Sequence, residues 1–256
     1  MSTKRRVPRS QEQIYDLTEA LSRNGKAVIE GPKRKKWSVH DIKQIRPLNI
    51  AQEDMFRSFF EGQHICAHGS AGTGKSYIAC FLALNELLRT DTPAKRIIIV
   101  RSAVATRDVG FMPGTLEEKT ALYELPYHDI MMDLVLPRRA GTYEDMKAAG
   151  LIFFNTTSFI RGLTWEDAVI IVDEAQSMNE HEINSIMTRV GENSRVIICG
   201  DCKQTDLIKT GKDISGLPHM LRIIDRLPMF TRIEFTQDDI VRSSFVKQWL
   251  IASDQV

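Results

Sequence analysis

A short glycine-rich segment constrains the fold of this chain more than any other feature of its sequence. The segment is GSAGTGKS, Gly69–Ser76, and it fits the pattern G-x-x-x-x-G-K-[ST] at every fixed position. An apolar stretch, His64–His68, precedes it, and a helical pattern, Lys75–Arg89, follows it. A strand, a tight glycine turn and a helix in this order present several backbone N–H groups to one point, where they attract phosphate. We therefore expect a phosphate-binding loop (P-loop) between a buried strand and a long helix.

Further apolar runs predict the rest of a sheet that is covered on both faces. Most of these runs are continuous rather than alternating, which is typical of parallel strands. The expected strands are Arg96–Val100, Leu151–Phe154, Ala168–Val172, Arg195–Cys199 and Arg232–Phe235. The expected helices are Gln52–Glu61, Leu116–Leu136, Tyr143–Ala149, Glu180–Val190 and Leu217–Arg226. Strands that alternate with helices predict an α/β fold with a mostly parallel sheet and helices on both faces.

Charge is unevenly distributed along the chain. Residues 1–46 carry 12 Lys and Arg against 5 Asp and Glu, whereas the remainder is mildly acidic. We expect residues 1–46 to form a basic, partly flexible arm and residues 47–256 to form the P-loop domain. The arm either contacts the phosphate backbone of a nucleic acid or is simply solvated. No apolar run approaches the roughly 20 residues that span a bilayer, so we expect no membrane partner and a cytoplasmic location.

The glycine-rich segment predicts a site for a nucleoside triphosphate and its magnesium ion. The glycines allow the backbone to bring its N–H groups against phosphate oxygens. The lysine would reach the β- and γ-phosphates, and the final hydroxyl would coordinate Mg²⁺. The cofactors are therefore ATP and Mg²⁺. The residues expected to bind them here are Gly69, Ser70, Ala71, Gly72, Thr73, Gly74, Lys75 and Ser76.

Two later motifs supply the groups that hydrolysis needs. Asp173 and Glu174 follow the apolar run Ala168–Val172 directly. We expect Asp173 to hold the Mg²⁺ shell and Glu174 to activate the attacking water as a general base, which favours a hydrolase over a kinase. The third motif is GDCKQ, Gly200–Gln204, again just past an apolar run, and Gln204 is placed to sense the γ-phosphate or the attacking water.

In this order the motifs resemble those of the PhoH family. The resemblance runs from about Pro47 to the carboxyl end, and it implies a RecA-like core similar to the first motor domain of superfamily-one helicases. GSAGTGKS is similar to GPAGTGKT of that family, and DEAQS is similar to DEAQN. The other similar segments are RSAV (Arg101–Val104), GFMPGTLEEK (Gly110–Lys119), FIRGLT (Phe159–Thr164), GDCKQTDL (from Gly200) and DIVR (Asp239–Arg242).

The resemblance implies three more site residues. Gln52 lies where helicases of this class place a glutamine that reads adenine, although it could equally be a lone surface glutamine. Arg242 is the best candidate for an arginine finger, which would hold the charge that develops on the γ-phosphate. Arg161 is a second candidate, and a structural salt bridge is as good an interpretation of it.

The resemblance also implies a function and partners. The first hypothesis is an ATPase that binds single-stranded RNA, or less favourably DNA, and that remodels it in the manner of a helicase. The alternative is an ATP-driven switch that acts on a protein partner. A small-molecule phosphotransferase is a weaker third hypothesis. About 50 residues follow GDCKQ, too few for a second motor domain. We therefore expect Arg242 to act either within its own chain or from a neighbour in a homo-oligomeric ring, with a hexamer as one candidate size.

Overall fold

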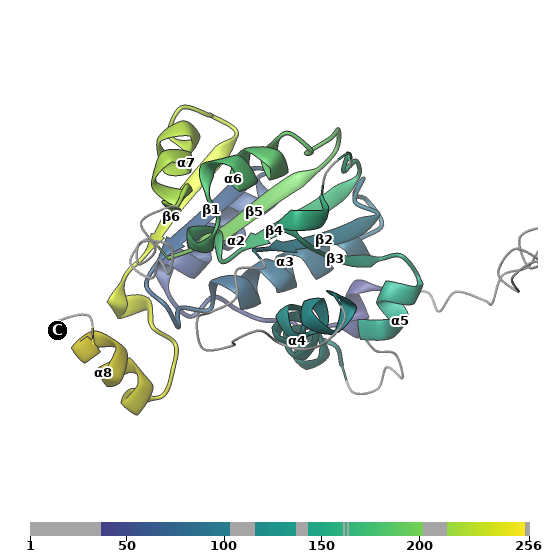
Figure 1. Ribbon diagram of the computed structural model, residues 1–256. Coiled ribbons are helices and arrows are strands. Elements are labelled where there is room, and N and C mark those ends of the chain that lie inside the picture. The colour runs from purple at the N-terminus through teal and green to yellow at the C-terminus, as the bar shows by residue number, and fades with distance from the viewer. Residues whose placement is uncertain are drawn as a thin grey trace, which may run out of the picture. The chain divides into compact units, whose positions relative to one another are not determined.

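A parallel sheet forms the centre of the fold (Figure 1). The computed structural model describes residues 37–102, 116–136, 143–160, 162, 164–201 and 214–253. The sheet has six strands in the order β3-β2-β4-β5-β1-β6, and every neighbouring pair runs parallel. The strands are β1 (His64–Gly69), β2 (Arg96–Arg101), β3 (Ile152–Thr156), β4 (Ala168–Asp173), β5 (Arg195–Gly200) and β6 (Phe230–Phe235). The α/β fold with a parallel sheet is therefore confirmed.

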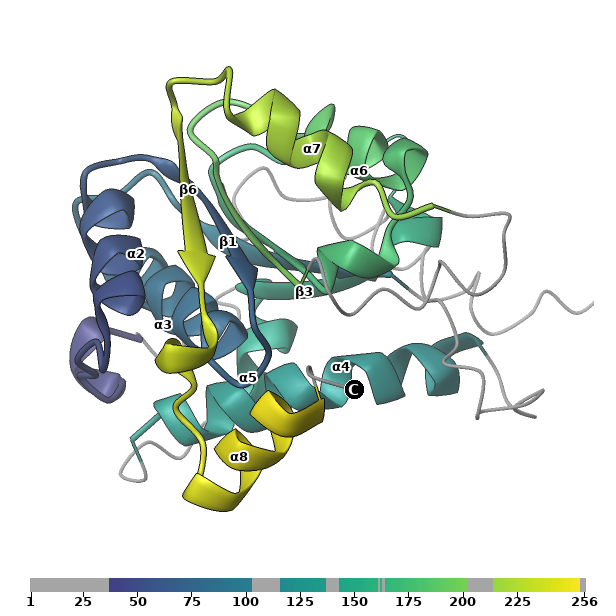
Figure 2. The same ribbon diagram turned by 90° about the vertical axis from the view of Figure 1, so that its left-hand side faces the viewer.

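Helices cover both faces of this sheet, as the sequence predicts. Figure 2 shows α2 and α3 on one side of the sheet and α6 and α7 on the other. Helices α4 and α5 contribute to the same core cluster as α2 and α3. The helices are α2 (Ile50–Phe60), α3 (Lys75–Leu88), α4 (Leu116–Leu134), α5 (Tyr143–Ala148), α6 (Glu180–Met187), α7 (Leu217–Ile224) and α8 (Ser244–Ser253).

The alternation of side chains along each central strand explains why the apolar runs are continuous. In β4, Val169 and Ile171 belong to the core cluster on the α3 face. Their neighbours Ile170 and Val172 belong to the cluster on the α6 face. Because successive side chains of a strand point to opposite faces, a strand that is covered twice needs apolar residues at every position.

Two segments at the ends of the described chain differ from what the sequence suggests. Residues 37–46, which the sequence analysis assigns to the basic arm, pack on the domain, where Ile42 is 2% exposed and bridges Val135. Contacts divide the chain between Lys36 and Trp37. Helix α8 was not predicted at all. None of its residues is buried, although Phe245 and Trp249 are four positions apart, the spacing of one helix face.

The carboxyl ends of the strands meet at one edge of the sheet. The P-loop follows β1 there, Asp173 ends β4, and Gly200 ends β5. Open parallel sheets bind their ligands at this edge, which is why the loops there carry the chemistry. None of the helices in the described ranges combines the length and the apolar character of a membrane-spanning segment.

Candidate functional site

The P-loop turns from β1 into α3 through backbone conformations that favour glycine. Gly74, immediately before α3, has φ +85°. Gly69 has φ +116°, and a Cβ atom on it would lie 2.1 Å from the carbonyl oxygen of Phe235 in β6. The glycine at position 69 is therefore required by the close approach of β6. The glycines were expected to let the chain turn tightly, and the positive φ angles of Gly69, Gly72 and Gly74 agree with that role.

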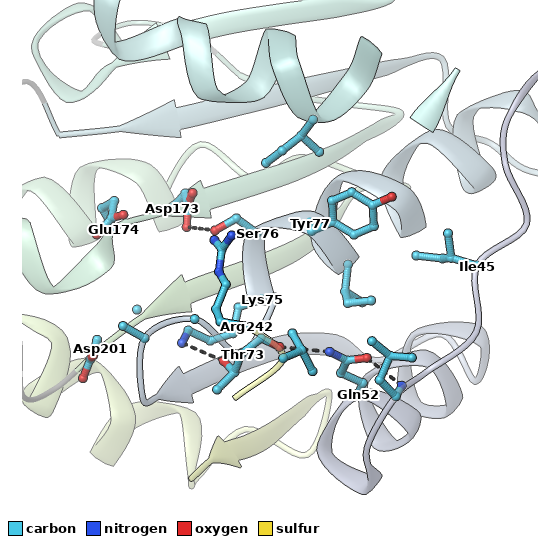
Figure 3. A pocket seen from close by; sticks show the side chains of 18 of the residues that line it. Ile45, Gln52, Thr73, Lys75, Ser76, Tyr77, Asp173, Glu174, Asp201 and Arg242 are labelled. Carbon is cyan, nitrogen blue, oxygen red and sulfur yellow. Dashed lines mark hydrogen bonds between the residues drawn. The ribbon is translucent and has the colours of Figure 1, made fainter. Parts of the chain in front are cut away.

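Lys75 folds back over the loop that precedes it. Its Nζ donates to the carbonyl oxygens of Gly69 (2.9 Å) and Ser70 (2.7 Å) and to Thr73 Oγ1 (3.2 Å). Burial lowers the pKa of Lys75, and the nearby acidic groups, Asp173 among them, oppose this effect. The loop thus encloses a cation at the point where the sequence predicts phosphate (Figure 3).

Ser76 and Asp173 lie side by side although they come from different elements. Ser76 Oγ, in the first turn of α3, donates to Asp173 Oδ1 at the end of β4 over 2.9 Å (Figure 3). The second carboxylate oxygen, Asp173 Oδ2, accepts from the hydroxyl of Tyr127 over 2.8 Å. In the sequence, Tyr127 resembles part of an aromatic and proline cluster that follows GFMPGTLEEK in the family, but nothing there assigned it to the metal site. It shares a buried helix face with Met131 and Leu134.

The donor set of this pair fits a magnesium ion. A hydroxyl and a carboxylate are hard oxygen ligands, which Mg²⁺ prefers. Within the described ranges, no group of three or more His, Cys, Asp or Glu side chains gathers as a metal site. Mg²⁺ commonly keeps several waters and is shared with substrate phosphates, so one protein carboxylate beside a hydroxyl is sufficient.

Glu174 follows Asp173 in a left-handed backbone conformation, with φ +54°. Burial, and next the charge of Asp173, raise the pKa of Glu174. Gln176 holds the carboxylate in place, because its Nε2 donates to Glu174 Oε2 over 2.5 Å. The other end of the same amide, Gln176 Oε1, accepts from the backbone N–H of Asp201 over 2.9 Å. This link between the ends of β4 and β5 was also missed in the sequence.

Gln52 lies in α2 and contacts the P-loop from the other side. It is 2% exposed, so the alternative of a lone surface glutamine is wrong. Its Nε2 donates to the carbonyl oxygen of Thr73 over 2.9 Å, and its Oε1 accepts from the backbone N–H of Leu48 over 2.8 Å (Figure 3). Gln52 thereby joins the segment before α2 to the middle of the P-loop.

Arg242 reaches the same loop from the carboxyl-terminal part of the chain. The backbone N–H of Val241 donates to the carbonyl oxygen of Gly72 over 3.1 Å. The Cγ of Arg242 lies 3.2 Å from the position that a Cβ atom on Gly72 would take. Arg242 is exposed, and no carboxylate among the described residues pairs with it.

Most of these residues line one cavity of about 740 Å³, within the range of roughly 300–1,000 Å³ that is usual for small-molecule sites. Ala71 and Gly72 also line it, as do the apolar or aromatic residues Ile45, Tyr77 and Ile130. Two predicted site residues, Gln204 and Arg161, lie outside the described residues. The cavity brings together the following predicted residues: Gln52, Ala71, Gly72, Thr73, Gly74, Lys75, Ser76, Asp173, Glu174 and Arg242.

The parallel sheet, the glycine loop and the acidic strand end define the P-loop NTPase fold. The large terminase of a thermophilic bacteriophage, solved in complex with ADP, has this fold too. It matches with a TM-score of 0.50 at 13% identity, over 79% of this chain and 49% of the terminase chain.

The model of the PhoH-like protein family matches residues 44–253, and the chain belongs to this family. It is 35% identical over 217 residues to the PhoH-like protein of Bacillus subtilis, covering 83% of this chain and 65% of that protein. It is 34% identical over 217 residues to Protein PhoH of Escherichia coli K12, covering 83% of this chain and 59% of that protein. This chain therefore spans somewhat less than two thirds of the length of these relatives. The resemblance noted in the sequence is confirmed.

Proposed function

We propose that this chain binds ATP with Mg²⁺ and hydrolyses it to ADP and phosphate. The observation that carries the proposal is the hydrogen bond between Ser76 and Asp173, formed directly beside the loop that encloses Lys75. A hydroxyl that opens a helix after a glycine loop, next to an acid that ends a neighbouring strand, matches what a Mg²⁺–triphosphate complex requires.

Each group of the site has a task in the proposed reaction. The N–H groups of the loop and Lys75 bind the β- and γ-phosphates, and Ser76 and Asp173 hold the metal. When bound, Mg²⁺ neutralises charge on the phosphate oxygens. Glu174 accepts a proton from water as the water oxygen attacks the γ-phosphorus and the bond to the β–γ bridging oxygen breaks. Its raised pKa makes it a better base than an ordinary glutamate.

Arg242 completes the proposed mechanism from the open side of the cleft. A guanidinium over the P-loop can hold two γ-phosphate oxygens while charge develops on them. Since Arg242 lines the cleft of its own chain, we propose that it acts in cis.

The test compares ATP hydrolysis and ATP binding in three variants. We expect Lys75→Ala to lose both and Glu174→Gln to lose hydrolysis while it still binds ATP, because only the base is removed. The matched control is Lys95→Ala, since Lys95 is an exposed lysine that pairs with Asp167 at the other edge of the sheet. A folded wild-type protein that does not bind adenine nucleotides in the presence of Mg²⁺ would contradict the proposal.

We further propose that hydrolysis is coupled to single-stranded nucleic acid, more favourably RNA than DNA. The support is the helicase-like order of the motifs, the basic composition of residues 1–46, and Arg101, which ends β2 at the same sheet edge as the site. Stimulation of the ATPase by single-stranded RNA and DNA, measured at several salt concentrations, tests the coupling. An equal rate with and without these polymers favours the alternative, a switch that acts on a protein partner.

A homo-oligomeric ring and a cytoplasmic location stay predictions. With Arg242 in the cleft of its own chain, the ring is no longer needed to complete the site, and the expectation rests on the resemblance alone. Light scattering after gel filtration measures the oligomeric state directly, and a monomer with full ATPase activity would contradict the ring.

A further inference from the structure

Tyr127 is a buried side chain of α4 whose hydroxyl contacts the proposed metal ligand. The residue is 1% exposed, and its hydroxyl donates to Asp173 Oδ2 over 2.8 Å. Asp173 Oδ1 accepts from Ser76. The two oxygens of this carboxylate are therefore held by donors from two different helices, α4 and α3.

The core fixes the position from which Tyr127 donates. Its ring packs against Phe154 of β3, with 5.7 Å between the ring centroids. It also belongs to the core cluster that contains Met131 and Leu134, its neighbours on the same helix face. The hydroxyl is the donor in this hydrogen bond, because an ionised carboxylate can only accept.

A fixed donor on one oxygen determines where the other oxygen points. The terminal torsion of an aspartate is broad, so a carboxylate without partners turns easily about its last bond. With Oδ2 held by Tyr127, Oδ1 is directed at Ser76, the side on which the proposed metal would lie. Groups that orient metal ligands in this way affect metal affinity, although they do not touch the metal.

We propose that Tyr127 is a positioning residue of the magnesium site, which orients Asp173 toward Ser76 through its hydroxyl. The inference rests on the proposed function, because it assumes that Asp173 serves a metal. It adds to that function a new role for Tyr127, because it assigns part of the affinity for Mg²⁺ to this core residue of α4. The sequence motifs of the site do not include this residue.

The experiment removes the hydroxyl alone, with Tyr127→Phe, so that the ring still fills its place in the core. The matched control is Tyr143→Phe. Tyr143 is 2% exposed in the same core cluster, and its hydroxyl donates to Glu124 over 2.7 Å, away from the site. Binding of a fluorescent ADP analogue is titrated with MgCl₂ and, separately, measured in EDTA, and the melting temperature of each variant is recorded.

We expect Tyr127→Phe to raise the Mg²⁺ concentration at half-saturation about 10-fold, the lower end of what loss of such a partner costs. Nucleotide binding in EDTA should stay at the wild-type level in both variants, and Tyr143→Phe should keep the wild-type Mg²⁺ titration. A purely structural hydroxyl would change the melting temperature and leave the Mg²⁺ titration unchanged.

Three outcomes would overturn the inference. In the first, Tyr127→Phe shows the wild-type Mg²⁺ titration, and the proposed function is unaffected. In the second, both phenylalanine variants shift the titration equally, which means that the effect is one of general stability. In the third, the wild-type protein itself binds no nucleotide at any Mg²⁺ concentration, and the proposed function then fails as well.

Discussion

The side-chain amide of Gln176 donates to Glu174 over 2.5 Å, and its oxygen accepts from the backbone of Asp201 over 2.9 Å. One amide thus connects the proposed general base to the end of the neighbouring strand β5. Gln176 is 4% exposed, so water does not compete for these bonds. A displacement of Asp201 would therefore move Gln176 and, through it, the carboxylate of Glu174.

Replacement of Gln176 should affect turnover more than nucleotide binding. Gln176→Glu keeps an acceptor for Asp201 but sets a second carboxylate against Glu174, and Gln176→Leu removes both bonds. We expect kcat to fall about 10- to 100-fold in both variants, because a base displaced by about 1 Å costs about that much. The KM for ATP should change little. Steady-state kinetics check this, and a rise in KM with an unchanged kcat would contradict it.

The negative charge on Glu174 should lower the free energy of unfolding at neutral pH. Its pKa is raised from 4.5 by burial and by Asp173, so the folded state binds the proton more tightly than the unfolded chain does. Stability linked to this group is therefore complete below pH 4.5 and is lost as the pH rises through the raised pKa. We expect Glu174→Gln to melt at a higher temperature than the wild type at pH 7, and at the same temperature at about pH 4, below the unfolded pKa.

Melting curves across this pH range measure the difference between the two proteins, in which the titration of groups distant from Glu174 cancels. The pH dependence of wild-type activity should also report the titration of Glu174, since the general base must be ionised. ATP hydrolysis should decline as the pH falls through the raised pKa, at a higher pH than for an ordinary glutamate. A melting temperature that rises by the same amount at both pH values would show that charge is not the cause.

A comparison of Gly69 with Gly62 separates two costs of an alanine substitution, the collision with β6 and the strain of the backbone. Both have a positive φ, +116° and +88°, but a Cβ atom on Gly62 would meet no other atom within 4 Å. Gly62→Ala should cost only the strain, about 1–2 kcal/mol. Gly69→Ala should lower the free energy of unfolding by about 1–3 kcal/mol more, because the new methyl group collides with Phe235. Urea denaturation measures both values, and equal losses would contradict the importance of the contact.

Arg242→Ala should abolish most of the hydrolysis and leave ATP binding intact. A guanidinium that holds the γ-phosphate contributes about 10³-fold or more to turnover. Arg226→Ala, at an exposed arginine that follows α7, is the matched control. If Arg242 acts in cis, a mixture of Arg242→Ala with Lys75→Ala, refolded together, stays inactive. Recovery of activity in the mixture would show instead that the arginine comes from a neighbouring subunit.

Local signals in the sequence were sufficient for the sheet and for the P-loop. The runs that form β2, β4 and β5 are continuous because both of their faces are buried, and the pattern of Gly69–Ser76 requires a strand before it and a helix after it. Both patterns lie within short continuous segments of the sequence, so they can be found without the tertiary structure.

The remaining features of the site depend on contacts between distant residues. Tyr127 and Asp173 lie 46 positions apart, and Gln176 and Asp201 lie 25 apart. Each pair is brought together by the packing of α4 on the sheet or by the order of the strands, and no periodicity along the chain encodes either. Helix α8 is a different case, because Phe245 and Trp249 have helical spacing in the sequence and the helix was still not predicted.

The bond between Val241 and Gly72 has a consequence for how the molecule is made. During translation the glycine loop leaves the ribosome early, but Val241 and Arg242 emerge only after all six strands. A nascent or truncated chain that stops in α7 would carry the complete P-loop and still lack one wall of the cleft. We therefore expect ATP to bind firmly only after the region around residue 241 has been synthesised and has folded back onto the loop.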